Sequence, residues 1–195
     1  GRRLRPIGPG GYTGGECYRA LVEILLAGGD FLSDRSLLDG PTQQLRGAHV
    51  LPSHATMFRF CGGADFGRVQ KAAAVNRTML ARAWASGAGP SGGMVTVDPD
   101  ATLVDTYGPD KEGSKFSYRG EVGLSPLIGV CGETGDVLAI RARGGNAHPG
   151  RDNAGFIREC VSAIPKLVRE TTNLRVRGAC AGYQHAAFNT AEEMG

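Results

Sequence analysis

Long hydrophobic runs are missing from this 195-residue sequence, and none approaches the roughly 20 apolar residues that a membrane-spanning helix needs. The five cysteines are scattered, odd in number and without a C-x-x-C pair. Their spacing argues against a structural zinc site and a disulfide framework, and it favours a reducing compartment. No signal-peptide pattern is present, and glycine-rich residues 8–16 are no P-loop because no Gly-Lys-Ser/Thr follows. Since the sequence begins at Gly1 rather than Met, we expect a fragment of a longer protein.

Lysine is also scarce, because the 22 basic residues comprise 18 Arg and 4 Lys. Arginine suits bidentate contacts with phosphate. Residues 1–90 contain 11 Lys and Arg against 6 Asp and Glu, a net charge of +5, whereas residues 91–195 contain 11 against 13, a net charge of −2. This division fits a protein that grips a phosphate backbone and performs metal chemistry on it. Charge alone nevertheless favours a simpler explanation, a coding bias toward Gly, Ala and Arg.

The first 90 residues carry helical patterns. Apolar residues recur at helical spacing over residues 17–39, and Gly28-Gly29 divides this stretch into two predicted helices. Ser53 is the predicted N-cap of a helix that begins in "LPSHATMFRFC". Alanine-rich residues 67–87 form the next helical stretch, in which Met79 and Trp84 are expected in the core.

Glycine-rich residues 87–93 ("GAGPSGG") predict a boundary between a helical, DNA-binding domain over 1–90 and a second domain over 91–195. In the second domain short β-branched runs predict a strand over residues 94–104, a second strand or pair of strands over 114–120 and 124–131, and strands over 137–143 and 174–177. Helices are predicted over 151–172 and 181–195. Three strands, a helix, a strand and a helix follow in the order that opens an RNase H-like fold. The fold class is therefore α/β, although many α/β folds share such fragments.

Two acids lie within the first predicted strand, "VTVDPDATLVD". Asp98 and Asp100 are two residues apart, so they share one face of a strand. Carboxylates are almost never fully buried without a partner. These acids either hold a metal ion in a cleft or lie at a strand end that faces water, and the pattern alone leaves both interpretations open.

Several short motifs surround this strand in a fixed order. They are D-x-D-A-T at 98–102, K-E-G at 111–113, Tyr118-x-Gly120, Pro126-Leu127, the Thr134-Gly135 turn and Arg143-x-Gly-Asn146, preceded by "LLAGGDFLSD" at 25–34 and "LPSHATMFRF" at 51–60. In these motifs the chain, from about Glu16 onward, resembles the insertion-sequence transposases of the DDE class, in the subgroup called DDE domain group 1.

The resemblance implies a partial RNase H-like domain in which Mg²⁺ or Mn²⁺ ions are held by three acids. Asp100 takes the position of the first catalytic aspartate and metal ligand, and Asp98 is the neighbour that could replace or assist it. Pro99 between them departs from the family pattern. The family's R-A-D-S-A-G reads R-G-A-C-A-G at 177–182, so Ala179 stands where the second aspartate belongs. The third acid, a glutamate, would lie beyond residue 195. We expect a truncated, degenerate copy with weak or absent metal binding and no strand cleavage.

The resemblance also implies DNA as partner, both element ends and target, together with a homo-oligomer or an intact transposase, no membrane, and a bacterial cytoplasmic, nucleoid-associated location. Ser53, Thr56 and Arg59 fit a recognition helix, although a capped structural helix explains them equally well. Arg77 and Arg82 are the predicted phosphate contacts. The alternatives to a DNA-cleaving enzyme are a non-catalytic DNA-binding or interaction remnant and a fragment that never folds stably.

Overall fold

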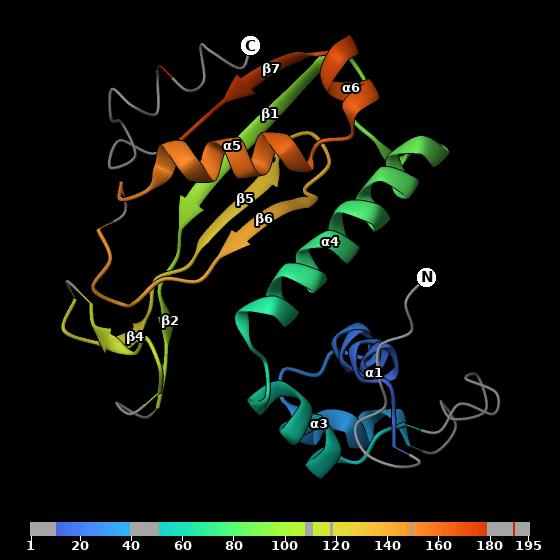
Figure 1. Cartoon of the computed structure of the whole chain (residues 1–195), viewed down its shortest axis with the longest axis vertical. Coiled ribbons are helices and arrows are strands. Elements are labelled where there is room, and N and C mark those ends of the chain that lie inside the picture. The colour runs from blue at the N-terminus through green and yellow to red at the C-terminus, as the bar shows by residue number, and fades with distance from the viewer. Residues whose placement is uncertain are drawn as a thin grey trace. The chain divides into compact units, whose positions relative to one another are not determined.

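The computed structural model describes residues 11–39, 51–107, 111–117, 119–148, 150–178 and 189 (Figure 1). Contacts divide the chain into two compact units, Gly1–Val69 and Gln70–Gly195, and the division falls within helix α4 (Phe66–Ala83). Helices and a mixed sheet place the chain in the α/β class, as the sequence predicts.

The first unit contains α1 (Gly14–Leu26), the 3₁₀ helix η1 (Leu32–Leu38) and α3 (His54–Gly62). Buried Ala20, Ile24, Leu38 and Met57 form their common core. The predicted helix break at Gly28-Gly29 is confirmed, since Gly28 adopts a left-handed φ of 84° that favours glycine. The predicted N-cap is confirmed too, because the Ser53 hydroxyl accepts a hydrogen bond from the Thr56 backbone N–H at 3.2 Å.

A four-stranded mixed sheet forms the centre of the second unit. Its strands are β1 (Met94–Ala101), β5 (Leu127–Cys131), β6 (Val137–Arg141) and β7 (Asn173–Val176). They are ordered β6-β5-β1-β7, and β1 runs antiparallel to β5 but parallel to β7. The predicted "GETGD" turn joins β5 to β6 as an antiparallel pair. β1 is therefore a central strand, with neighbours on both sides.

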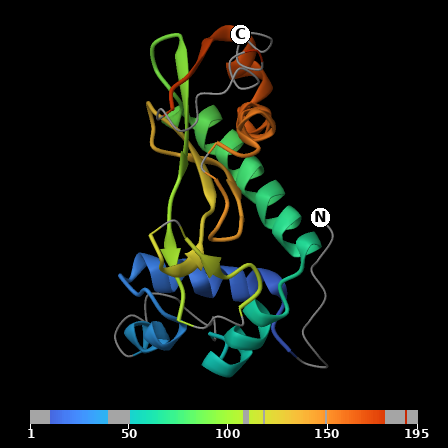
Figure 2. The same ribbon diagram turned by 90° about the vertical axis from the view of Figure 1, so that its left-hand side faces the viewer.

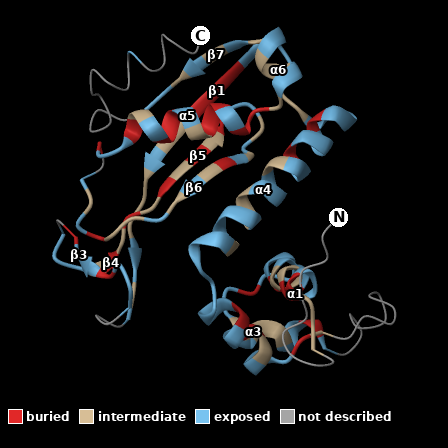
Figure 3. Ribbon diagram, viewed as in Figure 1, coloured by how far each residue is buried: buried red, intermediate tan, exposed pale blue. Residues whose placement is uncertain are grey.

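Helix α5 (Asn153–Ala163) lies against one face of this sheet (Figures 1 and 2). The hydrophobic core of the second unit combines buried residues of α5, β1 and β5 with Leu80, Trp84 and Leu138 (Figure 3). Gly129 of β5 permits the close approach, since a Cβ atom there would lie 2.3 Å from the Sγ atom of Cys160 on α5. Burial raises the pKa of the Cys160 thiol to about 12, so this cysteine stays a neutral core residue.

The alanine-rich helix ends earlier than the sequence predicts. α4 stops at Ala83, and a π-helical turn, η2 (Trp84–Ala88), follows with Gly87 at a φ of 97°. Trp84 is buried, as predicted, and its Nε1–H donates a hydrogen bond to Asp136 Oδ2 at 2.7 Å. The prediction for Met79 is wrong, because this side chain is 59% exposed and faces away from the core to which Leu80 belongs.

A second, smaller sheet lies beyond the end of β1. It consists of β2 (Val104–Asp105), β3 (Lys115–Phe116) and β4 (Val122–Leu124), ordered β2-β4-β3. The helical stretch predicted over 151–172 is two helices, α5 and α6 (Lys166–Thr171), with Pro165 immediately before α6. Proline lacks the N–H that a continuous helix would need at that position. The helix predicted over 181–195 falls outside the described residues, except for Asn189.

Candidate functional site at the end of strand β1

Asp100 lies near the end of the central strand, where β1 leaves the large sheet. Its Cα is paired with that of Ile128 on β5, and its side chain is exposed. Within the described part of the chain its carboxylate makes a local polar contact, a hydrogen bond that Asp100 Oδ1 accepts from the Ala101 backbone N–H at 2.9 Å. One carboxylate oxygen of Asp100 is thus held by its own backbone, and the side chain remains open to solvent.

Asp98 is held by an ion pair that crosses from β1 to the end of β7. Arg177 Nε donates to Asp98 Oδ1 at 2.9 Å, and Arg177 Nη2 donates to Asp98 Oδ2 at 2.5 Å. This bidentate geometry matches the fork of a guanidinium group to both oxygens of a carboxylate. The hydrogen bonds to Asp98 and its negative charge raise the pKa of Arg177 above its ordinary value. Both oxygens of Asp98 are therefore engaged by a protein cation.

Pro99 fits between the two acids without interrupting the ladder to β5. Val97 accepts a hydrogen bond from the Arg177 backbone N–H at 2.9 Å, so the amide groups of Val97 face β7. Alternate residues of a strand direct their amide groups to the same side, which places the ring nitrogen of Pro99 on that side as well. The β1–β7 pairing ends at Val97 and Val176, so proline lies just beyond the last paired residues.

The family's second acidic position follows β7 closely. A Cβ atom on Gly178 would lie 4.0 Å from the backbone oxygen of Pro99, so this part of the chain approaches the segment that carries Asp100. Ala179 itself lies outside the described residues.

A polar network that sequence reasoning missed supports the start of the same strand. Glu133, from the turn between β5 and β6, accepts hydrogen bonds from the Thr96 backbone N–H at 2.7 Å and from the Thr96 hydroxyl at 2.6 Å. Arg175 Nη2 on β7 donates to the same hydroxyl at 2.8 Å. Burial alone would raise the pKa of Glu133, but the hydrogen bonds from Thr96 and Cys131 outweigh it, and the pKa lies below its ordinary value. Glu133 thus extends the hydrogen bonding of β1 beyond the end of β5.

The carboxylates around Asp100 do not make up a two-metal site in the part of the chain that the structure describes. No group of three or more His, Cys, Asp or Glu side chains lies close enough together there to hold a metal ion. Hard cations require several oxygen ligands, and Asp98 already shares both of its oxygens with Arg177. The described donor set therefore does not fit the metal centre that the sequence resemblance implies.

Comparison with known proteins settles the family. The model of the family described as Transposase DDE domain group 1 matches residues 21–195. The chain belongs to this transposase family. No curated protein and no solved structure matches the chain. Family membership supports a transposase function, and with it DNA as partner and divalent metals as the family's usual cofactors.

The predicted DNA contacts of this transposase chain lie in both compact units. Ser53 and Thr56 lie at the start of α3, where their hydroxyl groups form a hydrogen bond with an oxygen–oxygen distance of 3.0 Å. Arg59 is exposed, with its Nε–H directed to the backbone oxygen of Ala55 at 3.3 Å. Arg77 and Arg82 belong to the part of α4 in the second unit, where Arg82 is exposed. None of the helices in the described ranges has the length and apolar character of a membrane span.

Proposed function

We propose that residues 91–195 contribute the first part of an RNase H-like transposase domain, with Asp100 as the first catalytic aspartate. The observation that carries this proposal is the sheet order β6-β5-β1-β7, with an antiparallel pair on one side of β1 and a parallel partner on the other. This arrangement places Asp100 on the central strand and brings the chain after β7 to its end. The family match over residues 21–195 supports the same assignment.

We also propose that this chain does not cleave DNA on its own. Two-metal phosphodiester cleavage needs carboxylates that clamp both ions. Ala179 supplies a methyl group where the family has its second aspartate, and a methyl group cannot ligate a hard cation. Asp98 is an unsuitable substitute because its oxygens are paired with Arg177. Mg²⁺ or Mn²⁺ would consequently bind weakly at Asp100.

DNA binding without cleavage is the function that remains. Its support is the net charge of +5 over residues 1–90 and the exposed arginines Arg59 and Arg82. In this proposal Arg59 and Arg82 contact the phosphate backbone, and Arg59 on α3 also favours the sequence of an element end. An intact transposase supplies the missing chemistry, and a second copy of this chain could only add DNA contacts. Helix α3 is in this proposal a recognition helix within a helical DNA-binding domain over 1–90.

A gel-shift titration of the 195-residue chain with an element-end duplex and a scrambled duplex tests this proposal. We expect binding to both at low salt, tighter binding to the element end, and an affinity that falls with salt at a log–log slope of roughly −0.9 per phosphate neutralised. Binding that does not change with salt, or its complete absence at low salt, would contradict the proposal. A circular dichroism melt on the same sample shows whether the chain is folded.

A further inference from the structure

A small pocket lies beside the end of β1, immediately after Asp100. Its volume is about 280 Å³, and it is lined by residues 101–103 together with Arg119, Ser125, Gly145 and Ala147. The lining comes from four separate segments of the second unit, so the pocket depends on the tertiary fold. Neither Asp98 nor Asp100 lines it, which distinguishes it from the acidic site itself.

Close packing of backbone against backbone forms one wall. A Cβ atom on Gly145 would lie 2.3 Å from the backbone oxygen of Gly123 and 2.4 Å from that of Lys115. Only glycine allows the 143–147 loop to approach β3 and β4 this closely. A β-bridge between Leu124 and Gly144 fixes the same approach.

Arg143 ties this loop to the floor of the pocket. Its Nε donates to the backbone oxygen of Ser125 at 2.9 Å, and its Nη2 donates to the Ser125 hydroxyl at 3.4 Å. Its Nη1 reaches the backbone oxygen of His148 at 3.1 Å. The guanidinium of Arg143 thus brings a positive charge to the buried side of Ser125 while holding the loop in place.

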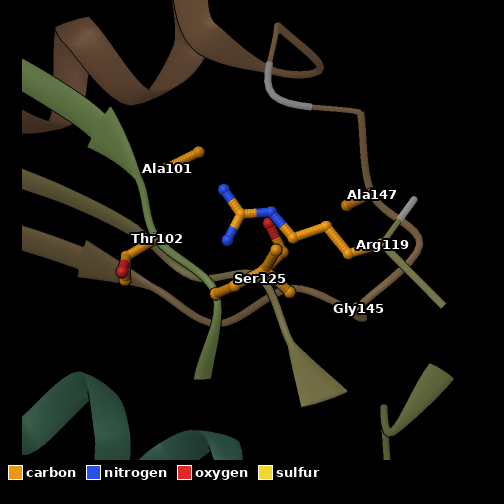
Figure 4. Close-up of a pocket in the computed structure, with 7 residues that line it drawn as sticks. Ala101, Thr102, Arg119, Ser125, Gly145 and Ala147 are labelled. Carbon is orange, nitrogen blue, oxygen red and sulfur yellow. The ribbon is translucent and has the colours of Figure 1, made fainter. Parts of the chain in front are cut away.

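A tight turn presents Arg119 from the opposite side. The Arg119 backbone N–H donates to the Ser117 hydroxyl at 3.1 Å, and the Gly120 N–H donates to the Ser117 backbone oxygen at 3.0 Å. Gly120 has a φ of 80°, which favours glycine in this turn. Figure 4 shows the Arg119 side chain extending across the pocket, with its guanidinium group toward Ala101 and the end of β1.

We propose that this pocket is a phosphate subsite for DNA, in which Arg119 binds a backbone phosphate next to the one that lies at Asp100. A guanidinium group offers phosphate two parallel hydrogen bonds. The Ser125 hydroxyl adds a neutral donor, and the described residues that line the pocket include no carboxylate that would repel an anion. The volume of about 280 Å³ leaves room for one phosphodiester group.

This subsite rests on the proposed function, because it requires DNA at the end of β1. The subsite would position the DNA strand beside Asp100, whereas the arginines of residues 1–90 would contact other parts of the DNA. Arg119 is therefore a positioning residue, and its effect is expected on DNA affinity and register.

Fluorescence anisotropy with a labelled duplex tests the subsite by comparing the wild-type chain with Arg119→Ala, Arg119→Lys and the control Arg169→Ala. The control removes the same charge from α6. Loss of a charged hydrogen bond predicts an affinity about tenfold weaker for Arg119→Ala, and a salt slope smaller by about 1. Arg119→Lys should recover part of the affinity, since lysine keeps the charge but lacks the planar fork. Arg169→Ala should change the affinity little.

A second readout needs no variant and therefore no assumption about folding. Phenylglyoxal modifies accessible arginines, and mass spectrometry measures the rate at each position with and without DNA. We expect DNA to protect Arg119 but not Arg169. Equal affinities for Arg119→Ala and Arg169→Ala, or equal modification of Arg119 with and without DNA, would overturn the subsite while wild-type DNA binding still upheld the proposed function. Failure of the wild-type chain to bind DNA at low salt would overturn both.

Discussion

Gly129→Ala is a direct test of the packing that places β1 and its acids. The added Cβ would lie 2.3 Å from Cys160 Sγ, whereas non-bonded carbon atoms prefer separations of about 3.5–4.0 Å. Both Cys160 and the neighbouring Phe156 are fully buried, so neither can move aside into solvent. Overpacking of this kind costs about 1–3 kcal/mol, and we expect a loss of about 2 kcal/mol in the free energy of unfolding.

Removing the colliding atom should remove most of that cost. In a Cys160→Ala background the new methyl group would meet Phe156 at 3.4 and 3.5 Å, which are ordinary contacts. We therefore expect Gly129→Ala to cost less than about 0.5 kcal/mol there, which corresponds to a coupling energy of about 1.5 kcal/mol between the two positions.

Urea denaturation followed by tryptophan fluorescence measures these free energies. Trp84 is the only tryptophan, and it is buried in the core of the second unit. Gly155→Ala on α5 is the matched control, because its Cβ would meet nothing closer than Arg141 Nη1 at 3.8 Å. The control should be neutral or stabilising by up to about 1 kcal/mol. An equal cost of Gly129→Ala with and without the Cys160 thiol would refute the proposed packing of α5 on β5.

Three further predictions concern charge. Because the pKa of Glu133 is lowered in the folded state, Glu133 should stabilise the fold above its unfolded pKa of about 4.3 and lose that contribution as the pH falls through the folded value. The difference in urea midpoint between wild type and Glu133→Gln should therefore be larger at pH 7 than at pH 3, and a constant difference would contradict this. Arg59→Ala should reduce the preference for an element-end duplex over a scrambled one, whereas Arg77→Ala should weaken both equally, as gel shifts would reveal. Millimolar Mn²⁺ should leave the melting temperature nearly unchanged. A ligand present at 100 times its Kd would instead stabilise the fold by about 2.7 kcal/mol and raise the melting temperature. A clear rise that Asp100→Ala abolishes would contradict weak metal binding.

Local patterns were sufficient to predict several elements of the fold. The β-branched run around Asp98 predicts β1, the "GETGD" turn predicts the β5–β6 hairpin, and Gly28-Gly29 predicts the break after α1. Each of these features is determined within a few neighbouring residues, through side-chain alternation or the left-handed conformation that glycine allows. The family motifs then pointed to Asp100, which the sheet places on its central strand.

Contacts between distant residues could not be predicted in this way. Arg177 and Asp98 are 79 residues apart, and their pairing depends on the register between β1 and β7. The contact between Glu133 and Thr96 depends in the same way on where β5 ends beside β1. The sequence alone does not assign a partner to Asp98. The fold brings Arg177 beside it, and the two side chains form an ion pair.

The local sequence pattern also could not predict which apolar residues of a helix are buried and which are exposed. Met79 is as apolar as its neighbour Leu80, yet only Leu80 is buried. Residues one apart on a helix point in directions about 100° apart, so which of them is buried depends on where the sheet lies. The sequence contained the apolar residues of α4 but not the position of their partner.

A nicking assay on supercoiled plasmid tests the central claim most directly, namely that this transposase family member retains Asp100 but does not cut DNA alone. Wild type and Asp100→Ala are incubated with plasmid in Mg²⁺ and, separately, in Mn²⁺, and nicked circles are quantified on a gel. We predict no nicked product above the protein-free control for either protein in either metal. Nicking by the wild-type chain that requires metal and disappears in Asp100→Ala would contradict the account.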